Sequence, residues 1–339
     1  LHRFRHSFPT RRSSDLFENS PAGYFGKTFI FCRGFEMRDS TYLDELFIQE
    51  SKAALNYHNK SSGDTYEDDL IGLIDGTATE ITIPGGCTKI GEYAFYNHKN
   101  LALTSLPDGI TSIGKYAFYE CTNLALTSLP SGITSILNNT FYNCTNLALT
   151  SLPSGIEIIE QYAFHTCRNL ALASLPDGVT SIGNFAFLGC TNLALTSLPD
   201  GITSIGAGAF RECTNLALTS LPSGITRIPN DTFYNCTNLA LTSLPNGIEI
   251  IEQYAFANCT NLALTSLPSS ITTIASQAFY MCYGLTTITF NSTPTSIDNY
   301  AFYRCDKVTT INVPWAEGEV ANAPWGATNA TINYNYTGG

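Results

Sequence analysis

The sequence predicts a repeat solenoid built from units of 23 residues, and two ladders of identical residues carry that prediction. A phenylalanine recurs every 23 residues, ten times without a break. A cysteine keeps the same spacing nine times. A fixed period in the twenties is typical of solenoids, in which each unit stacks only on its neighbours. The phenylalanines are Phe95, Phe118, Phe141, Phe164, Phe187, Phe210, Phe233, Phe256, Phe279 and Phe302, and the cysteines are Cys121, Cys144, Cys167, Cys190, Cys213, Cys236, Cys259, Cys282 and Cys305.

One unit, Cys121 to Asn143, shows the pattern, and we number its 23 places from the cysteine. Leucines stand at places 4, 6 and 9, a proline at place 10, isoleucines at places 13 and 16, and the phenylalanine at place 21. The run from Leu124 to Thr127 alternates with period two, which predicts a short strand that ends at the turn signal of Pro130 and Gly132. Ile133 to Ile136 predicts a second short extended piece. The residues before the phenylalanine predict a turn or a short helical turn.

A single unit cannot fold alone. Its few large apolar side chains do not offset the conformational entropy that 23 ordered residues lose. Stability must therefore come from contacts between units and from caps at the two ends. We expect one curved solenoid of about ten units in which the phenylalanines are buried.

The last unit and the first unit are the most diagnostic in sequence. In the last unit, Leu285, Ile288 and Phe290 form the motif L-x-x-I-x-F, and the same unit ends on S-I-x-x-x-A-F. The opening unit, from Ile81 to Phe95, reads ITIPGGCTKIGEYAF and is similar. Together they resemble the BspA-type (treponemal-type) leucine-rich-repeat family of cell-surface proteins, over about residues 75–314. The middle units depart from this pattern, because they read L-A-L-T-S-L where the family has L-x-x-I-x-I.

The resemblance implies a leucine-rich-repeat solenoid of the α/β type, rich in β-strand, curved and right-handed. It also implies a non-enzymatic protein of the cell surface or extracellular space, whose repeats adhere to protein or glycan ligands. A phage-encoded structural or receptor-binding protein of the virion is the alternative, because similar arrays occur there. The family supplies no catalytic residue and no cofactor.

The sequence itself carries no catalytic constellation. It contains no grouping of Ser, His and Asp and no H-E-x-x-H motif. We therefore predict no enzyme activity for the array. The remaining possibility is an enzyme domain that preceded the array in the original gene.

The N-terminal end needs separate treatment. His6 to Leu16 is the translation of a common sequencing adapter, so we expect residues 1–16 to be an artefact and the start of the gene to be replaced. Residues 17–69 are expected to form a poorly defined N-terminal segment. Within it, Thr41 to Tyr57 predicts one weak amphipathic helix.

The rest of the chain divides into the array and its C-terminal end. The solenoid is expected to span residues 70–313. Residues 314–339 contain two Pro-Trp pairs and are expected to form a C-terminal cap. In this cap, Trp315 and Trp325 would cover the last open end of the core.

Composition narrows the set of partners. The net charge is −11 and the chain has 17 lysines and arginines, which argues against nucleic acid as a partner. The small number of basic residues also provides no polybasic patch that could bind an anionic membrane. No run of 18 apolar residues appears, so no membrane-spanning helix is predicted. We expect a monomer that binds a protein or carbohydrate ligand and holds no metal or other cofactor.

Two ladders are assigned structural roles. The cysteines from Cys121 to Cys305 are expected to be buried free thiols at a tight turn, because neighbours in line would be poorly aimed for disulfides and no C-x-x-C pair suggests zinc. The asparagines at place 3 are expected to be buried and to satisfy backbone groups of the neighbouring turn. They begin with Asn123 and Asn146 and continue at Asn169, Asn192, Asn215, Asn238 and Asn261.

Candidate ligand contacts come from the positions that vary between units. Variation concentrates at places 15, 17–19 and 22–23, and tyrosine is favoured in contact surfaces. A second candidate for the ligand-binding face is the uniform row of Ala125, Thr127 and their equivalents. Recent duplication of a four-unit block also explains this uniformity. The duplication is visible where IEIIEQYAF recurs after 92 residues. The predicted contact residues are Tyr116, Tyr119, Tyr142, Tyr162, Arg211, Tyr234, Tyr254 and Tyr280.

Overall fold

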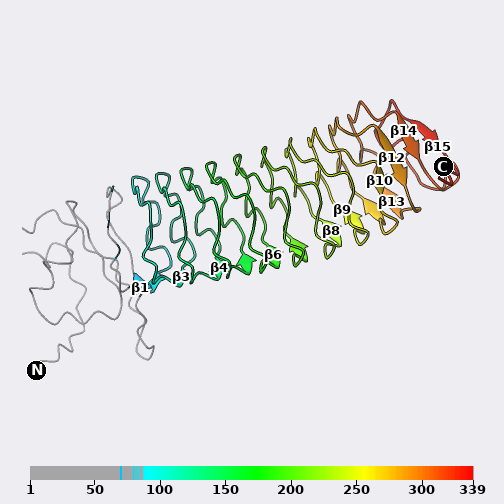
Figure 1. The fold of residues 1–339 in the computed structure, drawn as a ribbon. Coiled ribbons are helices and arrows are strands. Elements are labelled where there is room, and N and C mark those ends of the chain that lie inside the picture. Colours follow the sequence, from blue (N-terminus) through cyan, green and yellow to red (C-terminus); the bar gives the residue numbers. More distant parts are fainter. Residues whose placement is uncertain (1–68, 71–78, 80, 82, 84–86, 339) are drawn as a thin grey trace, which may run out of the picture.

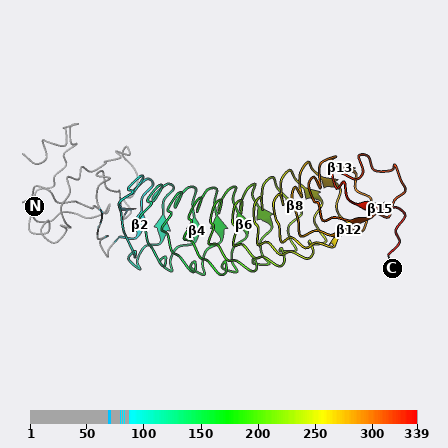
Figure 2. The same ribbon diagram turned by 90° about the horizontal axis from the view of Figure 1, so that it is seen from above.

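The computed structural model describes residues 69–70, 79, 81, 83 and 87–338. The artefact expected at residues 1–16 and the helix expected at 41–57 lie outside the described residues. The described part is one elongated stack of turns that runs from the N-terminal strand β1 to the C-terminal strand β15 (Figure 1). The second view shows the same narrow rod from above (Figure 2). The predicted solenoid is confirmed.

A row of two-residue strands at places 15 and 16 runs along the stack, and all its pairings are parallel. From β2 onward the partners are 23 residues apart, as in Ser135 opposite Ile158. From β2 onward, the isoleucine at place 16 of each strand is buried in the core. The strands are β1 (Asp69–Leu70), β2 (Lys89–Ile90), β3 (Ser112–Ile113), β4 (Ser135–Ile136), β5 (Ile158–Ile159), β6 (Ser181–Ile182), β7 (Ser204–Ile205), β8 (Arg227–Ile228), β9 (Ile250–Ile251), β11 (Thr273–Ile274) and β13 (Ser296–Ile297).

Among the described residues, a second parallel row is present only at the C-terminal end, in the order β10-β12-β14-β15. Its strands are β10 (Ser266–Leu267), β12 (Thr287–Phe290), β14 (Thr310–Asn312) and β15 (Thr331–Asn333). Between place 17 and the next cysteine the backbone makes turns, and the described residues contain no helix. Accordingly, no helix in this part of the chain could cross a membrane.

The strand predicted at Leu124 to Thr127 is wrong for the middle units. Thr127 and Ser128 both face solvent between the buried Leu126 and Leu129, and two adjacent outward residues break the period of a pleated strand. Most of these units keep a backbone bond at place 5, such as the Ala125 N–H to the Leu103 carbonyl at 3.0 Å. In β12 the burial alternates strictly, and there a strand forms.

The core is a continuous stack of phenylalanine rings. All ten are 0% exposed, and successive ring centroids are 5.0 to 5.7 Å apart. At the C-terminal end, the rings of Trp315 and Trp325 pack on Phe290 at 5.2 and 6.0 Å. Both tryptophans are buried and belong to the same hydrophobic core as the phenylalanines.

The main strand row is interrupted twice, between β3 and β4 and between β7 and β8. In the uninterrupted units the N–H at place 17 donates to the strand behind it, as from Gly206 to the Ile182 carbonyl at 2.8 Å. At the second break, place 17 is Pro229, which has no N–H to donate. The two breaks lie 92 residues apart, which is the period of the duplicated block.

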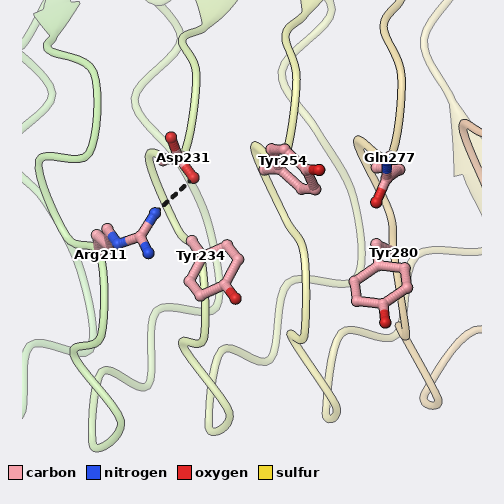
Figure 3. A pocket seen from close by; sticks show the side chains of 6 residues that line it. All are labelled: Arg211, Asp231, Tyr234, Tyr254, Gln277 and Tyr280. Atoms are coloured by element: carbon pink, nitrogen blue, oxygen red, sulfur yellow. Dashed lines mark hydrogen bonds and ion pairs between the residues drawn. The ribbon is translucent and has the colours of Figure 1, made fainter.

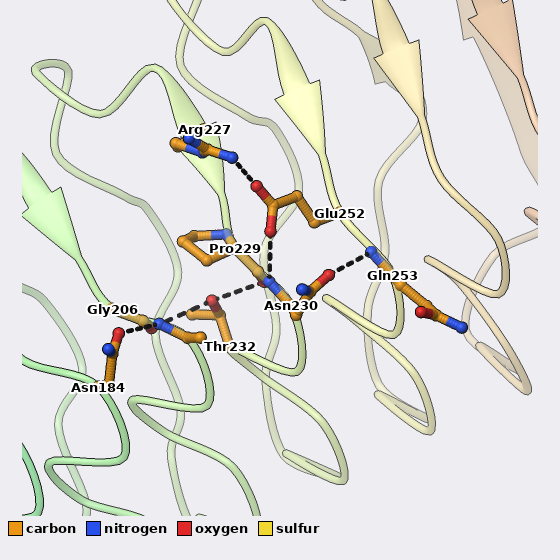
Figure 4. A network of polar contacts seen from close by, with 9 residues as sticks. Asn184, Gly206, Arg227, Pro229, Asn230, Thr232, Glu252 and Gln253 are labelled. Atoms are coloured by element: carbon orange, nitrogen blue, oxygen red, sulfur yellow. Dashed lines mark hydrogen bonds and ion pairs between the residues drawn. The ribbon is translucent and has the colours of Figure 1, made fainter.

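A polar network bridges the break at Pro229 (Figure 4). The Thr232 hydroxyl donates to the Pro229 carbonyl at 2.8 Å and lies 3.5 Å from the Gly206 carbonyl. The Asn230 N–H donates to the Glu252 carboxylate at 3.0 Å, and that carboxylate also pairs with Arg227. Thr232 stands where most units have alanine, and at the first break the equivalent Thr140 makes the same two contacts, to the Leu137 carbonyl at 2.9 Å and the Gly114 carbonyl at 3.3 Å.

We expect Thr232→Val to destabilise the solenoid by about 0.5–1.5 kcal/mol, because it removes the hydroxyl's bond to the Pro229 carbonyl and leaves only the longer bond from the Thr232 N–H at 3.3 Å, while it changes little volume. Urea denaturation followed by circular dichroism measures this change. Thr214→Val is the control, because its hydroxyl lies only 3.5 Å from a carbonyl at a half-buried site, and its cost should stay within about 0.5 kcal/mol. Equal costs for the two variants would contradict this role for Thr232.

Candidate functional site

The residues at places 19 and 22 of successive turns form one lengthwise row, which we call the turn stripe. It begins at Tyr93 and Tyr96 and ends at Tyr300 and Tyr303. The non-glycine residues at place 19 from Tyr93 to Gln277 have φ values between 54° and 60°, so the backbone there is left-handed. Alternate backbone N–H groups of this turn donate to backbone carbonyls of the next unit. For example, the Phe118 N–H donates to the Thr140 carbonyl at 2.9 Å. The repeated turn therefore holds successive side chains in line.

The N-terminal half of the turn stripe is a nearly unbroken aromatic stack. Tyr96, Tyr119, Tyr142 and His165 stand at place 22, and their ring centroids are 4.8, 4.5 and 4.3 Å apart in order. At place 19, Tyr93 stacks on Tyr116 at 4.9 Å, and Tyr162 stacks on Phe185 at 5.3 Å. Burial in this stack lowers the pKa of His165.

The C-terminal half differs, because it opens into a shallow cavity of about 470 Å³ (Figure 3). Arg211 lies over the Tyr234 ring at 4.1 Å and donates to the Asp231 carboxylate at 2.8 Å. Burial raises the pKa of Asp231, although the Arg211 guanidinium opposes that rise. The cavity is lined by Arg211, Asp231, Tyr234, Tyr254, Gln277 and Tyr280.

All eight residues predicted as ligand contacts lie on the turn stripe. Tyr116, Tyr119, Tyr142 and Tyr162 belong to its N-terminal half, and Arg211, Tyr234, Tyr254 and Tyr280 line the cavity. All eight side chains are half-buried against their neighbours in the row.

The exposed rings are at the two ends of the stripe, and the prediction did not include them. They share the 23-residue register with the predicted tyrosines, and that register was the signal that would have identified them. The same register places Asp231 and Gln277 in line with Tyr254. The exposed tyrosines are Tyr93 at 49%, Tyr96 at 44%, Tyr300 at 49% and Tyr303 at 43%.

The nine ladder cysteines are buried free thiols. Each thiol donates to the carbonyl of the phenylalanine 26 residues earlier, at 3.0 Å from Cys121 to Cys282 and 2.8 Å at Cys305. Burial raises the pKa of Cys121 to about 12 and raises that of Cys213 well above its usual value. Such thiols are unreactive towards alkylating reagents in the folded protein.

The prediction that the asparagines at place 3 are buried is wrong, because all seven are exposed. They stand at the tip of a turn, where the side chain points to solvent. The neighbouring threonine at place 2 bridges the units instead. Thr122 and Thr145 donate to the place-2 carbonyl of the preceding unit at 3.2 Å, where Lys99 and Thr122 provide the acceptors.

Comparisons with known proteins agree with this architecture. The model of the BspA type leucine rich repeat region, in its six-copy form, matches residues 75–194, 157–282 and 227–320. Among curated protein sequences, none matches this chain.

Two solved structures illustrate the likeness. A leucine rich cell surface protein from Faecalibacterium prausnitzii is 25% identical with a TM-score of 0.50, and the match covers 85% of this chain and 93% of that one. A leucine-rich repeat protein from Eubacterium ventriosum is 19% identical with a TM-score of 0.41, covering 77% and 93%. Because the family matches together span residues 75–320, most of the sequence, the chain belongs to the BspA-type leucine-rich-repeat family.

Proposed function

We propose that this protein is a non-enzymatic adhesion protein of the cell surface, and that its turn stripe is the ligand-binding face. The observation that carries the proposal is the stripe itself. Tyrosines from successive units line up on one face, although the positions they occupy vary most along the sequence. A stack that only needed to fold would not require aromatic rings at a solvent-facing turn.

The physical properties of the stripe suit recognition. Tyrosine combines a large apolar face with a hydroxyl and has few rotatable bonds, so its immobilisation on binding costs little entropy. Stacking on neighbours already fixes the rings, as in the 4.5 Å pair of Tyr119 and Tyr142. Membership of a family with a cell-surface relative supports the location. The virion protein stays the alternative, and no contact in the structure favours it.

Binding to arrays of host glycans and matrix proteins, with the full chain as the probe, tests the proposal. We expect replacement of four stripe tyrosines by alanine to weaken the captured interaction by at least about tenfold, since hot-spot residues are enriched in tyrosine and the truncation of one costs about 2 kcal/mol or more. The matched control replaces four outward threonines on the Leu-Ala-Leu-Thr runs and should change affinity less than about twofold. The tyrosines are Tyr119, Tyr142, Tyr234 and Tyr280, and the threonines are Thr127, Thr150, Thr219 and Thr242.

The reverse ranking of the two variants would contradict the proposal. Turnover of a substrate by the purified chain, with no binding to any array, would also overturn it. Circular dichroism of both variants keeps the comparison interpretable, because the substituted side chains lie outside the buried core.

A further inference from the structure

The two breaks in the main strand row share one exchange of residues. Thr140 and Thr232 stand at place 20 in the units that follow the first and the second break, and both are 0% exposed. At place 20 the other units have alanine, namely Ala94, Ala117, Ala163, Ala186, Ala209, Ala255, Ala278 and Ala301. Place 17 differs between the breaks, because it is Leu137 at the first and Pro229 at the second. The buried threonine is therefore the feature that both breaks have in common.

Two backbone bonds are missing at each break. Elsewhere between β2 and β13, the place-17 N–H donates to the place-16 carbonyl of the preceding unit at 2.8 or 2.9 Å, and in most of these units the place-14 N–H also donates to the preceding unit. Among the described residues, the place-14 N–H groups of Thr134 and Thr226 have no backbone acceptor, and neither has the Leu137 N–H. Leucine has the donor that proline lacks, so proline alone does not explain why the row is interrupted.

The threonine side chain accounts for both breaks. Compared with alanine, it adds a methyl group and a hydroxyl at a fully buried position between two units, and close-packed interiors accommodate added atoms by shifts of the backbone. The Thr140 hydroxyl lies 3.3 Å from the Gly114 carbonyl, and the Thr232 hydroxyl lies 3.5 Å from the Gly206 carbonyl (Figure 4). Gly114 and Gly206 stand at place 17 of the unit before each break. Each hydroxyl therefore lies between the two units at the end of the strand row.

Each break is open only along the strand row. At the turn, the Phe118 N–H donates to the Thr140 carbonyl at 2.9 Å across the first break. The Phe210 N–H donates to the Thr232 carbonyl at 3.0 Å across the second. At place 5, the bond from the unit after each break also remains, at 3.1 and 3.2 Å. Two units that are fastened at some places and unbonded at another can rotate about the bonds that remain.

We propose that the two breaks are hinges created by Thr140 and Thr232, and that the solenoid bends there between three stiff segments. The segments carry the strands β1–β3, β4–β7 and β8–β13 of the main row. The second hinge lies at the cavity of the turn stripe, because Arg211 belongs to the unit before it and Asp231 and Tyr234 belong to the unit after it. Bending there changes the position of Arg211 relative to the rest of the cavity. The inference goes beyond ligand binding and holds whether or not the stripe binds a ligand.

Pulsed EPR on the full chain tests the hinges through distance distributions between pairs of spin labels. Each pair occupies exposed place-11 residues that are 69 residues, or three units of 23, apart. We expect the distributions across the breaks to be at least about 1.5 times as wide as that of a pair within the middle segment. The unsubstituted chain, whose ladder thiols are buried, gives the labelling background. The pairs are Asp108→Cys with Asp177→Cys across the first break, Ser154→Cys with Ser223→Cys across the second, and Ser131→Cys with Asp200→Cys within the middle segment.

Three substitutions separate the threonine from other causes of bending. Thr140→Ala should narrow the distribution across the first break to the width found in the middle segment, because the Leu137 N–H then bonds to the Ile113 carbonyl. Thr140→Val keeps the added volume and should leave that distribution wide. Ala186→Thr inserts a threonine within the middle segment and should widen the distribution of the pair that spans it.

Equal widths for the three pairs in the wild type would overturn the hinges. A wide distribution across the first break that persists in Thr140→Ala would reject the threonine as their cause. Hydrogen exchange of the Leu137 amide decides the matter if Ala186→Thr fails to fold. Exchange at least about tenfold slower in Thr140→Ala than in the wild type supports the proposal, and an unchanged rate contradicts it.

Discussion

Raising the pH from 8 to about 10 is expected to unfold the solenoid, through the thiols of its core. Burial raises the pKa of eight ladder cysteines, so they stay protonated in the folded state. In the unfolded chain a thiol ionises near pH 8.5. Above that pH the unfolded state binds fewer protons than the folded state, so stability falls as the pH rises towards the folded-state pKa values.

The expected size of this effect is large. Each raised thiol contributes about 1.4 kcal/mol of lost stability per pH unit within that window, so eight together contribute on the order of 10 kcal/mol per unit. That is comparable with the whole stability of an ordinary domain. Urea denaturation at successive pH values measures the slope.

Replacement of Cys144, Cys167 and Cys190 by alanine is the control for the alkaline unfolding. It should lower stability at pH 7 but reduce the slope above pH 9 by about three eighths, because three of eight thiols are gone. The stability of the wild type should change far less per pH unit near pH 7 than above pH 9. An unchanged slope in the triple variant would show that other groups cause the alkaline transition.

Phe210→Ala is expected to cost about 3–5 kcal/mol. The ring is 0% exposed and stacks on Phe187 at 5.5 Å and on Phe233 at 5.7 Å, so truncation leaves a cavity between two units. Each unit depends on its neighbours, so the loss should appear first as faster amide exchange in the turns beside residue 210.

Phe185→Ala makes the same chemical change on the surface and serves as the control. That ring is half-buried and stacks on Tyr162 at 5.3 Å, so we expect a cost near 1 kcal/mol. Thermal unfolding compares the two variants. Similar costs for both would mean that the phenylalanine ladder is not the main source of stability.

The ladders were sufficient to predict the fold, because a strict period leaves one way to bury a recurring phenylalanine. The strands were harder to predict. Leu124, Leu126 and Leu129 are all buried, as their pattern suggests. The spacing between these leucines changes from two residues to three, and as a result both Thr127 and Ser128 face solvent. That detail decides between a strand and an irregular segment, and hydrophobicity alone does not reveal it.

The candidate site was predictable in outline. Variation and tyrosine content identified the turn stripe, because contact residues differ between units while core residues repeat. The cavity was not predictable, because it depends on how side chains from four successive units pack against one another.

For the asparagines at place 3, the sequence led to a wrong prediction of burial. Constant residues invite a structural explanation, yet Asn123 and its equivalents face solvent while Thr122 makes the bond between units. Two adjacent constant places cannot be distinguished by period alone. Their direction depends on the turn geometry, which only the structure supplies.

A crystal structure of the full chain with its tightest-binding array ligand tests the central claim most directly. We predict that the ligand lies along the turn stripe and contacts the place-22 tyrosines, with the Leu-Ala-Leu-Thr face free. A ligand bound across Ala125, Thr127 and their equivalents, with the stripe untouched, would contradict the assignment of the binding face.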